Sequence, residues 1–542
     1  MTEVKRVFKV NGNPFFPLGA QSCNSSGYDD KHSETAFKAI QMLHGNTLEI
    51  PVYWNQCEPK EGKYDFASVD DLIASARQYG IKLILLWFAT WKNGNMDYAP
   101  AWVKTNPKRF KRVISQTGNE VWNLSAHCKA NQEVDKNAFA ALCQHLKTKD
   151  SKEQTVIGIQ IQNESGILGS DRDYGPDGET VFKNNVPAKL VTAMKKTGKG
   201  YVFDMWQKAG GKTAGTWPEL FGWEAGEFMT AWGIATYIDN MAAAGKKNYD
   251  IPMYINVWLM GQGWWPIPGE AYPSGGAVTK VLDIYKWFTP HVDMISPDAH
   301  VADTKNYEAV CAAYTREDNP FFMPETGAAG NAHAWNMFRS IANYNCLGEF
   351  FFGVERILAP DGSVRPENQI VVDSVRCTAA VIPLLLKYQG TGKIHAVIQE
   401  DLSMSVLMDF EGYSGVVEFG DRRGGYNGKD WKHPSNDVPK APSYNNRGRG
   451  LIIQTGKNEF YLVGANYRLF LRPKSAVENL HPRLAIADFA PKMPGWNMVS
   501  IDEGHFDSNG KFVIDQCRNG DEADPAAWVE PDCGVIRVIA CE

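Results

Sequence analysis

The sequence predicts an α/β protein in which a (β/α)8 TIM barrel precedes an all-β sandwich. Eight short apolar or alternating runs recur between helical patterns over residues 15–353. After a last helical pattern near 371–388, only short strand-like runs separated by turn residues follow. A chain of 542 residues is also too long for one hydrophobic core. We therefore expect the barrel over residues 1–392 and an accessory β-sandwich over 393–542.

The eight predicted barrel strands alternate with amphipathic segments. Within residues 68–79 the apolar side chains recur at helical spacing, and Gly80 follows as a helix C-cap. An open doubly wound sheet is the alternative, but no glycine-rich phosphate turn follows the first strand. The strands are predicted at residues 15–21, 46–54, 81–88, 155–163, 252–258, 292–298, 320–325 and 346–353.

Two features decorate the predicted barrel. A β-hairpin precedes it, with Asn11-Gly12 as the two-residue turn between residues 4–10 and 14–16. The longest interruption, about residues 165–225, follows strand four and is rich in Gly, Asp and Pro. Because it follows the C-terminal end of a strand, we expect it at the mouth of the barrel, where sites form. Whether it is a lid over the site or decoration stays open.

The C-terminal region has the pattern of an all-β domain. Residues 420–450 form a long polar loop inside it, which we expect at the surface or at a partner contact. The strand-like runs lie at residues 394–398, 404–408, 414–419, 451–454, 459–463, 467–471, 496–501 and 535–539.

Composition and charge disfavour several functions. The net charge is −6, and no long basic run offers the concentrated positive charge that nucleic acid requires. No window approaches a membrane span, and the N-terminus has no apolar signal core. We expect a cytoplasmic protein, with a secreted or periplasmic protein that has lost its signal as the alternative. A homo-oligomer remains open.

Cysteine and histidine spacing predicts neither a metal site nor a cofactor. The 10 cysteines include no C-x-x-C pair, so we expect free thiols, with Cys517–Cys533 as one disulfide to test. The 11 histidines form no H-E-x-x-H motif, and no phosphate-binding G-x-x-x-x-G-K-[ST] occurs. A Ser-His-Asp triad stays open, although no G-x-S-x-G elbow supports one.

Tryptophan is unusually abundant. Many of the 17 tryptophans stand beside Asn, Gly, Pro or Glu instead of inside apolar runs. Flat rings at such places suit a ligand with apolar faces and polar edges, as sugars have. We expect Trp54 and Trp87 to bind such a ligand; the alternative is that these rings cover edges of the core.

The fourth predicted strand, VIGIQIQNE, ends in a carboxylate. Its isoleucines alternate with Gly158, Gln160 and Gln162, so isoleucines on the helix side would leave these residues and Glu164 facing the barrel interior. Strand seven repeats this arrangement, since Glu325 closes the run FFMPE. Glu164 and Glu325 should therefore face each other across the mouth.

Hydrolysis of a glycosidic bond requires two carboxyl groups in this arrangement. One carboxyl must hold a proton for the leaving oxygen, and the other must stay ionised. A separation of about 5–5.5 Å would indicate retaining chemistry, and a wider gap would admit an inverting water. Glu349 and Glu355, near the end of strand eight, could compete for the nucleophile role. Glu49 lies low in strand two, where a structural role is expected.

Polar and aromatic residues at other strand ends complete the predicted pocket. Tyr254, Asn256 and Trp258 share a parity on strand five, although Tyr254 could instead fill a barrel layer. Asp298 and His300 end strand six, and His300 could bind a sugar hydroxyl or face solvent.

Two motifs resemble known glycoside hydrolases. Gln162-Asn163-Glu164 is similar to the Asn-Glu signature at strand four of clan A, and residues 54–66, WNQCEPKEGKYDF, resemble the run after strand two of β-galactosidase families 35 and 42. The resemblance covers roughly residues 10–390. It implies Glu164 as acid/base, Glu325 as nucleophile and Asn163 as a donor to the sugar 2-hydroxyl, without a cofactor.

The resemblance is incomplete at strand three. Family 35 enzymes carry a glutamate there that holds the galactose ring, whereas residues 87–94, WFATWKNG, contain no acid. We expect a retaining exo-β-glycosidase of β-galactosidase type, acting on a carbohydrate substrate by a two-glutamate double displacement. The alternatives are a glycosidase for arabinopyranose, fucose or xylose, and a non-catalytic carbohydrate-binding barrel.

Overall fold

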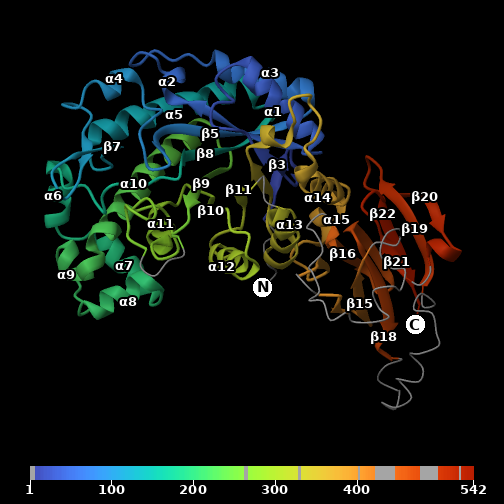
Figure 1. Cartoon of the computed structure of the whole chain (residues 1–542). Helices are drawn as coiled ribbons and strands as arrows, with labels where there is room; N and C mark the ends of the chain where they lie inside the picture. The colour runs from blue at the N-terminus through green and yellow to red at the C-terminus, as the bar shows by residue number, and fades with distance from the viewer. Residues whose placement is uncertain are drawn as a thin grey trace, which may run out of the picture.

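The protein contains a closed barrel of eight parallel strands, as the computed structural model in Figure 1 shows. The structure describes residues 6–261, 266–327, 331–400, 403–420, 446–475, 498–523 and 526–541. The barrel order is β10-β11-β12-β3-β4-β5-β8-β9. Its strands are β3 (Leu18–Gln21), β4 (Thr47–Tyr53), β5 (Lys82–Lys92), β8 (Val156–Asn163), β9 (Met253–Trp258), β10 (Met294–Ala299), β11 (Met323–Gly327) and β12 (Glu349–Phe352). The predicted fold class is confirmed.

Helices surround the barrel because their apolar faces pack against the outward side chains of the strands. The helix α3 ends at Tyr79, where Gly80 adopts the left-handed conformation (φ 69°) and caps it as predicted. The helices around the barrel include α1 (Asp30–Met42), α3 (Ala67–Tyr79), α5 (Lys129–Asp150), α10 (Ala225–Asn248), α11 (Leu282–Phe288), α12 (Thr304–Tyr314), α13 (Asn331–Tyr344), α14 (Gln369–Ala379) and α15 (Ile382–Tyr388).

The predicted hairpin forms at the start of the described chain. Strands β1 (Phe8–Val10) and β2 (Asn13–Phe15) pair across Asn11 and Gly12, which both have positive φ. Phe8 packs against Phe322, with ring centroids 5.6 Å apart, and joins the apolar cluster that fills the barrel. The hairpin thereby closes the lower end of the barrel and leaves the upper end for a site.

The insertion after strand four is helical and lies to one side of the barrel. It contains α6 (Pro176–Lys183), α7 (Ala188–Thr197), α8 (Tyr201–Lys208) and α9 (Trp217–Phe221), which gather near α10 and α11 in Figure 1. Glu224 and Glu227, at its end, are buried and pair with Lys280. This ion cluster ties the insertion to the segment before α11.

The C-terminal region forms two antiparallel sheets with a shared core, which is a β-sandwich arrangement. One sheet contains β13 (Ile394–Ile398), β16 (Arg449–Gly456), β17 (Glu459–Ala465), β22 (Val535–Ala540), β19 (Met498–Phe506) and β20 (Phe512–Arg518). The other contains β14 (Ser405–Phe410), β15 (Tyr413–Phe419), β18 (Tyr467–Pro473) and β21 (Ala527–Val529). Strands β20 and β21 were not predicted. Most of the predicted 420–450 loop lies outside the described residues.

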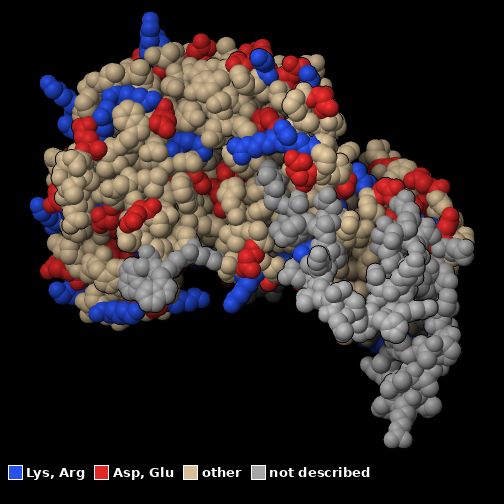
Figure 2. All heavy atoms as spheres, in the orientation of Figure 1, with Lys and Arg blue, Asp and Glu red and all other residues tan. Residues whose placement is uncertain are grey.

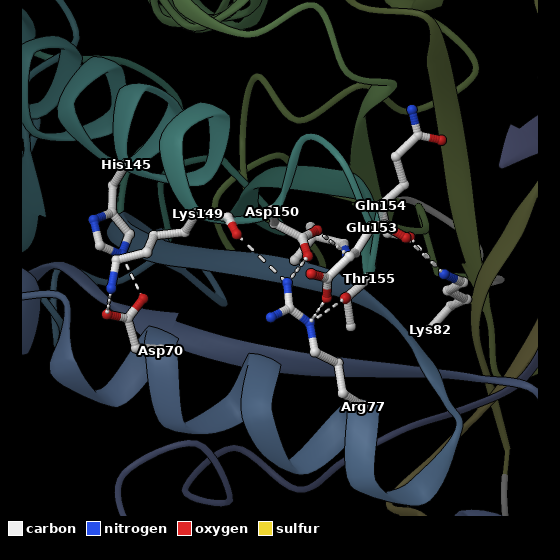
Figure 3. Close-up of polar contacts among 10 residues, drawn as sticks. Asp70, Arg77, Lys82, His145, Lys149, Asp150, Glu153, Gln154 and Thr155 are labelled. Carbon is white, nitrogen blue, oxygen red and sulfur yellow. Dashed lines mark hydrogen bonds and ion pairs between the residues drawn. The ribbon is translucent and has the colours of Figure 1, made fainter. Parts of the chain in front are cut away.

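An ion network occupies the lower end of strands β5 and β8 (Figure 3). Arg77 of α3 reaches Asp150 at 2.7 Å and Glu153 at 2.7 Å. The second carboxylate oxygen of Asp150 accepts the backbone N–H of Val156, the first residue of β8, at 2.7 Å. Lys82, the first residue of β5, donates to the carbonyl of Gln154 at 2.8 Å. These bonds fix where both strands begin.

Surface charge and cysteine state agree with an ordinary globular protein. Basic and acidic residues are mixed over the face in Figure 2. All 10 cysteines are free thiols, so the predicted Cys517–Cys533 disulfide is wrong: Cys517 is exposed on β20, whereas Cys533 is buried.

Within the described residues, no single helix is long and apolar enough to cross a membrane. Only the segments Pro366–Ala379 and Ile382–Tyr388 together reach that length and apolarity, and they are bent by 61° relative to each other.

Candidate active site

A cavity of about 950 Å³ opens at the C-terminal ends of the barrel strands. Glu164 and Glu325 both line it, as the sequence predicts. No residue of the insertion at 165–225 is among its described lining, so the lid interpretation finds no support there. The polar lining residues include Asn24, Lys92, Asn93, Glu164, Asp298, His300, Asn306, Glu325 and Arg356, and the apolar ones include Trp258, Leu259, Met260 and Val310.

Glu164 is placed by an unusual backbone at the end of β8. Gln162 and Glu164 have φ angles of 63° and 45°, in the left-handed region that such residues rarely adopt. Gln162 therefore leaves the alternation, and its amide reaches Asp135 of α5 at 2.6 Å. The predicted inward direction of Gln162 is wrong for this reason. The N–H of Glu164 donates to Asn256 Oδ1 at 2.8 Å, which fixes the acid in the cavity wall.

Glu325 is held by two donors. Gln21, the last residue of β3, donates through Nε2 to Oε2 at 3.0 Å, and His300 Nε2 lies 2.9 Å from Oε1. Burial alone would lower the pKa of His300, but its bond to Glu325 and the charge of that carboxylate raise it. Gln21 and His300 thus hold both oxygens of the Glu325 carboxyl group in place in the cavity wall. Sequence reasoning missed Gln21, although it ends the first predicted strand.

Glu164 has the opposite electrostatic setting. Burial and then the negative charge of Glu325 raise its pKa to about 7, while Lys92 opposes that rise. Glu164 is 8% exposed, against 7% for Glu325, so the two acids are buried to a similar extent. At neutral pH a large fraction of Glu164 holds a proton, which a general acid requires.

Lys92 supplies a buried cation to the cavity. It ends β5, is 7% exposed, and its ammonium group lies 5.0 Å from the centre of the Phe88 ring. Nζ donates to Asn93 Oδ1 and forms no ion pair with a described carboxylate. Burial lowers the pKa of Lys92, and the charges of Glu164 and Glu325 partly offset this effect. Lys92 thus balances the two acids from a distance and keeps donors available.

Asp298 is a third acid in the cavity. It is 3% exposed and accepts a 2.7 Å bond from Asn256 Nδ2. Its Cα stands in register with Glu325 on the neighbouring strand. Burial raises its pKa well above the usual value, and the charges of Glu325 and Glu164 add to that rise. Asp298 and His300 were predicted together at this strand end, but only His300 was assigned a candidate role.

Four of the predicted binding residues lie at or beside the cavity. Trp258 and His300 line it. Asn256 bridges Glu164 and Asp298, so it positions acids beside the cavity. Asn163 is fully buried, and neither its Nδ2 nor its Oδ1 has a partner in the described part of the protein. A buried amide without partners is costly, and Asn163, which directly precedes Glu164, is not itself among the residues that line the cavity.

Three predicted binding residues belong to the packing instead. Trp54 is fully buried and donates to Glu58 at 2.8 Å. Trp87 faces the helices and donates to Asp135 at 3.0 Å. Tyr254 fills the barrel interior and donates to Glu49 at 2.6 Å. None of the three lines the cavity. Strand parity turns Trp87 toward the helices and Tyr254 into the barrel interior, and Trp54 lies in the short helix Trp54–Cys57 that follows β4.

The competing acids are also engaged elsewhere. Glu349 accepts bonds from Ser340 of α13 and Tyr307 of α12, and burial raises its pKa to about 8. Glu355 accepts the hydroxyl of Ser26 and the N–H of Cys23. Neither glutamate is among the residues that line the cavity.

Two segments of the chain match known families. Residues 25–212 match the glycoside hydrolase family 42 description "Beta-galactosidase", and residues 376–530 match a "Domain of unknown function (DUF5597)". A beta-galactosidase from Xanthomonas manihotis is 25% identical over 144 residues, which is 25% of this chain and 22% of that relative. The match therefore spans under a quarter of the relative's length. The predicted resemblance to β-galactosidases is confirmed for the N-terminal part of the barrel.

Solved structures with a similar course of the chain are distant in sequence. The catalytic domain of a beta-amylase from Paenibacillus polymyxa is 13% identical, with a TM-score of 0.49 over 67% of this chain and 98% of its own. Beta-galactosidases from Bacillus circulans sp. alkalophilus and Halorubrum lacusprofundi are 13% and 14% identical. Their TM-scores are 0.46 and 0.48, over 68% and 67% of this chain and 56% and 58% of theirs.

Proposed function

We propose that the protein is a retaining exo-β-glycosidase of β-galactosidase type, which hydrolyses terminal sugars from oligo- or polysaccharides. The observation that carries the proposal is the pair of glutamates in one cavity with contrasting surroundings. Glu325 accepts hydrogen bonds from Gln21 and His300, while burial and the charge of Glu325 raise the pKa of Glu164 to about 7. Two acids with such different partners can divide the acid and nucleophile roles.

The first half of the reaction uses both acids at once. Glu325 attacks the anomeric carbon, while Glu164 gives its proton to the leaving oxygen. The bond between the sugar and the leaving group breaks as the bond to Glu325 Oε forms. In the second half, Glu164 takes a proton from water, and that water's oxygen displaces Glu325 from the anomeric carbon. Two displacements restore the original β configuration.

The cavity supports a sugar as the ligand. Its volume of about 950 Å³ lies at the upper end of sites for small molecules, which suits a terminal sugar with part of its leaving group. Trp258 offers a ring for an apolar sugar face. Asn163, which directly precedes Glu164, is the residue that the resemblance to clan A implies as a donor to the sugar 2-hydroxyl. The family match over residues 25–212 favours galactose over arabinopyranose, fucose and xylose.

The test is an activity screen with a binding control. Nitrophenyl β-galactoside, α-arabinopyranoside, β-fucoside and β-xyloside should include a substrate, with the galactoside hydrolysed fastest. Glu325→Gln should lower kcat by roughly 10³-fold or more while sugar binding survives. Glu308→Gln is the matched control, because Glu308 of α12 pairs with Arg339 of α13 and is not among the residues that line the cavity. Sugar binding without hydrolysis of any glycoside would instead indicate a non-catalytic binding barrel.

A further inference from the structure

We propose that Asp298 is a positioning residue whose carboxyl group stays protonated and donates a hydrogen bond to the carboxylate of Glu164. The inference deepens the proposed glycosidase function and rests on it for its catalytic meaning. It makes the site a three-acid site, in which only two acids touch the reacting atoms.

One amide places Asp298 and Glu164 together. Asn256 Oδ1 accepts the backbone N–H of Glu164 at 2.8 Å, and Asn256 Nδ2 donates to Asp298 Oδ2 at 2.7 Å. The Asn256 amide therefore accepts a hydrogen bond from the backbone of Glu164, the proposed acid/base, and donates one to Asp298, the third acid. Since Asp298 and Glu325 are also in register, Asp298 lies between the two proposed catalytic strands.

The hydrogen bonds around Asp298 require a proton. Its Oδ2 has the donor from Asn256, but its Oδ1 is buried and receives no N–H or O–H from another described residue. The side chains of Asp298 and Glu164 also lie within hydrogen-bonding reach of each other. Two ionised carboxylates cannot form such a bond, because both would only accept. One proton must therefore lie between them.

The surroundings place that proton on Asp298. Charged or titratable groups face it from β5 (Lys92), β8 (Glu164), β9 (Tyr254), β11 (Glu325), α12 (Tyr314) and the end of β10 (His300). Two of these groups are acids, and Lys92 opposes them only in part. Burial acts more strongly on Asp298, at 3% exposure, than on Glu164, at 8%. Burial, together with the charges of Glu325 and Glu164, raises the pKa of Asp298 well above its usual value.

The proton on Asp298 serves the step in which Glu164 carries charge. After Glu164 has given its proton to the leaving oxygen, its carboxylate remains in a buried site where an unpaired charge is costly. The Asp298 hydroxyl donates to this carboxylate without transferring its proton. Glu164 then takes a proton from the attacking water, and Asp298 ends the cycle unchanged. The donor also orients Glu164 toward the leaving group.

Two substitutions distinguish a neutral Asp298 from an ionised one. Asp298→Asn imitates the protonated acid, since its amide can donate to Glu164 and accept from Asn256. Asp298→Leu has a similar size but neither donates nor accepts. The measurement is the alkaline limb of the pH profile of kcat/KM, which reports the loss of the Glu164 proton in the free enzyme.

If Asp298 is neutral, the two variants should differ in the alkaline limb of their pH profiles. In Asp298→Asn, the midpoint of the alkaline limb should stay within about 0.3 pH unit of the wild-type midpoint. This variant should also retain most of the activity that Asp298→Leu loses. Asp298→Leu removes a donor that stabilises ionised Glu164, so its limb should move up by about one pH unit. An ionised Asp298 would instead raise the pKa of Glu164 by repulsion. The alkaline limb of both variants would then move to lower pH, and that result overturns the proposal.

An infrared measurement decides the same question without activity. The difference spectrum of wild type and Asp298→Asn at neutral pH should show loss of the C=O stretch of a neutral carboxylic acid. Asp303→Asn is the control, because Asp303 is an exposed N-cap of α12 and asparagine caps helices equally well; it should lose carboxylate bands. Loss of carboxylate bands in Asp298→Asn overturns the proposal. If the wild type hydrolyses no glycoside, the proposed function fails while this result still stands.

Discussion

Strands β5 and β8 carry charged groups at both ends, and the two ends differ in how those groups are paired. At the lower end, Asp150 accepts from Arg77 and from the N–H of Val156, and Lys82 donates to two backbone carbonyls (Figure 3). At the upper end, Lys92 forms no ion pair with a described carboxylate. Glu164 stands there among other acids.

The helix layer and the mouth of the barrel shift acids in opposite directions. Burial alone would raise the pKa of Asp70, which lies on α3 next to α5, but hydrogen bonds from Lys149 and His145 of α5 outweigh burial, so that pKa is lowered. Burial raises the pKa of Glu164 at the mouth, and the charge of Glu325 raises it further. The lower end therefore stabilises the fold, while the upper end holds charges that a bound substrate can use. Substitutions at the two ends should separate stability from activity.

The largest effect is expected for Glu164→Gln. Because glutamine cannot give a proton to the leaving oxygen, kcat/KM on substrates with poor leaving groups should fall by roughly 10³-fold. Nitrophenyl glycosides, whose leaving groups need little protonation, should lose far less. Kinetics on both substrate types test this, and an equal loss on both would argue against Glu164 as the acid.

The same variant should make the protein more stable. The folded-state pKa of Glu164 is about 7 and its ordinary value is 4.5, so wild-type stability falls as the pH rises from 4.5 to 7. Above pH 7 the full penalty applies, at most about 3 kcal/mol for a shift of this size. Glu164→Gln removes it, so its unfolding free energy in urea should exceed that of wild type above pH 7 and match it near pH 4. A destabilised variant would contradict the electrostatic account.

The two lysines at the ends of β5 should also differ in effect: Lys92 should affect activity, and Lys82 should affect stability. Lys92→Met removes the cation that opposes the rise in the pKa of Glu164, so the alkaline limb of kcat/KM should move upward. We also expect kcat/KM to fall by roughly 10²-fold, because a donor to the substrate is lost. Lys82→Met is the matched variant on the same strand. It should lower the melting temperature and leave the pH profile in place; an equal change in both profiles would refute the contrast.

Asp150→Ala should affect stability alone. It removes a fully buried carboxylate that bonds Arg77 and the N–H of Val156, so the free energy of unfolding should drop by about 3 kcal/mol. Urea denaturation measures this, and kcat/KM should stay close to wild type. Glu34→Ala is the control, because the pair of Glu34 with Lys38 is exposed and should contribute about 0.5 kcal/mol or less. Equal losses of unfolding free energy in both variants would show that the network around Asp150 does not stabilise the fold.

The smallest effect is expected for Asp70→Asn. The pKa of Asp70 is lowered in the fold, so its contribution is present above the unfolded-state pKa near 3.8 and is lost as the pH falls through the folded value. About a third of the side chain is exposed, so the loss at pH 7 should be only about 0.5 kcal/mol. Below pH 3 wild type and variant should converge. A difference that persists in acid would point to packing instead of charge.

The sequence predicted the features that depend on chain periodicity. Apolar runs and turn residues gave the eight strands and the hairpin, and acids at two strand ends gave Glu164 and Glu325. What failed depends on local backbone angles: the left-handed Gln162 turned toward Asp135. The parity of a strand also cannot tell a cavity wall from a core layer, which is why Tyr254 was misassigned. Trp54 and Trp87 were assigned from their polar neighbours in the sequence, which do not reveal that both rings are buried.

The contacts among polar residues were beyond sequence reasoning for a different reason. Gln21, Asn256 and Asp298 come from three separate strands, and their roles follow from distances across the barrel. No spacing along the chain encodes such a distance. Only their positions at strand ends were visible, and that property is shared with residues that do not reach the cavity.

The most direct test of the division of labour between Glu164 and Glu325 is the configuration of the product formed when azide replaces the missing carboxylate. Glu164→Ala with azide and a nitrophenyl β-glycoside should give the β-glycosyl azide, because Glu325 still forms the covalent intermediate and azide attacks it from the opposite face. Glu325→Gly with azide should give the α-glycosyl azide by one direct displacement. Products of the reversed configurations, or the same configuration from both variants, would contradict the account.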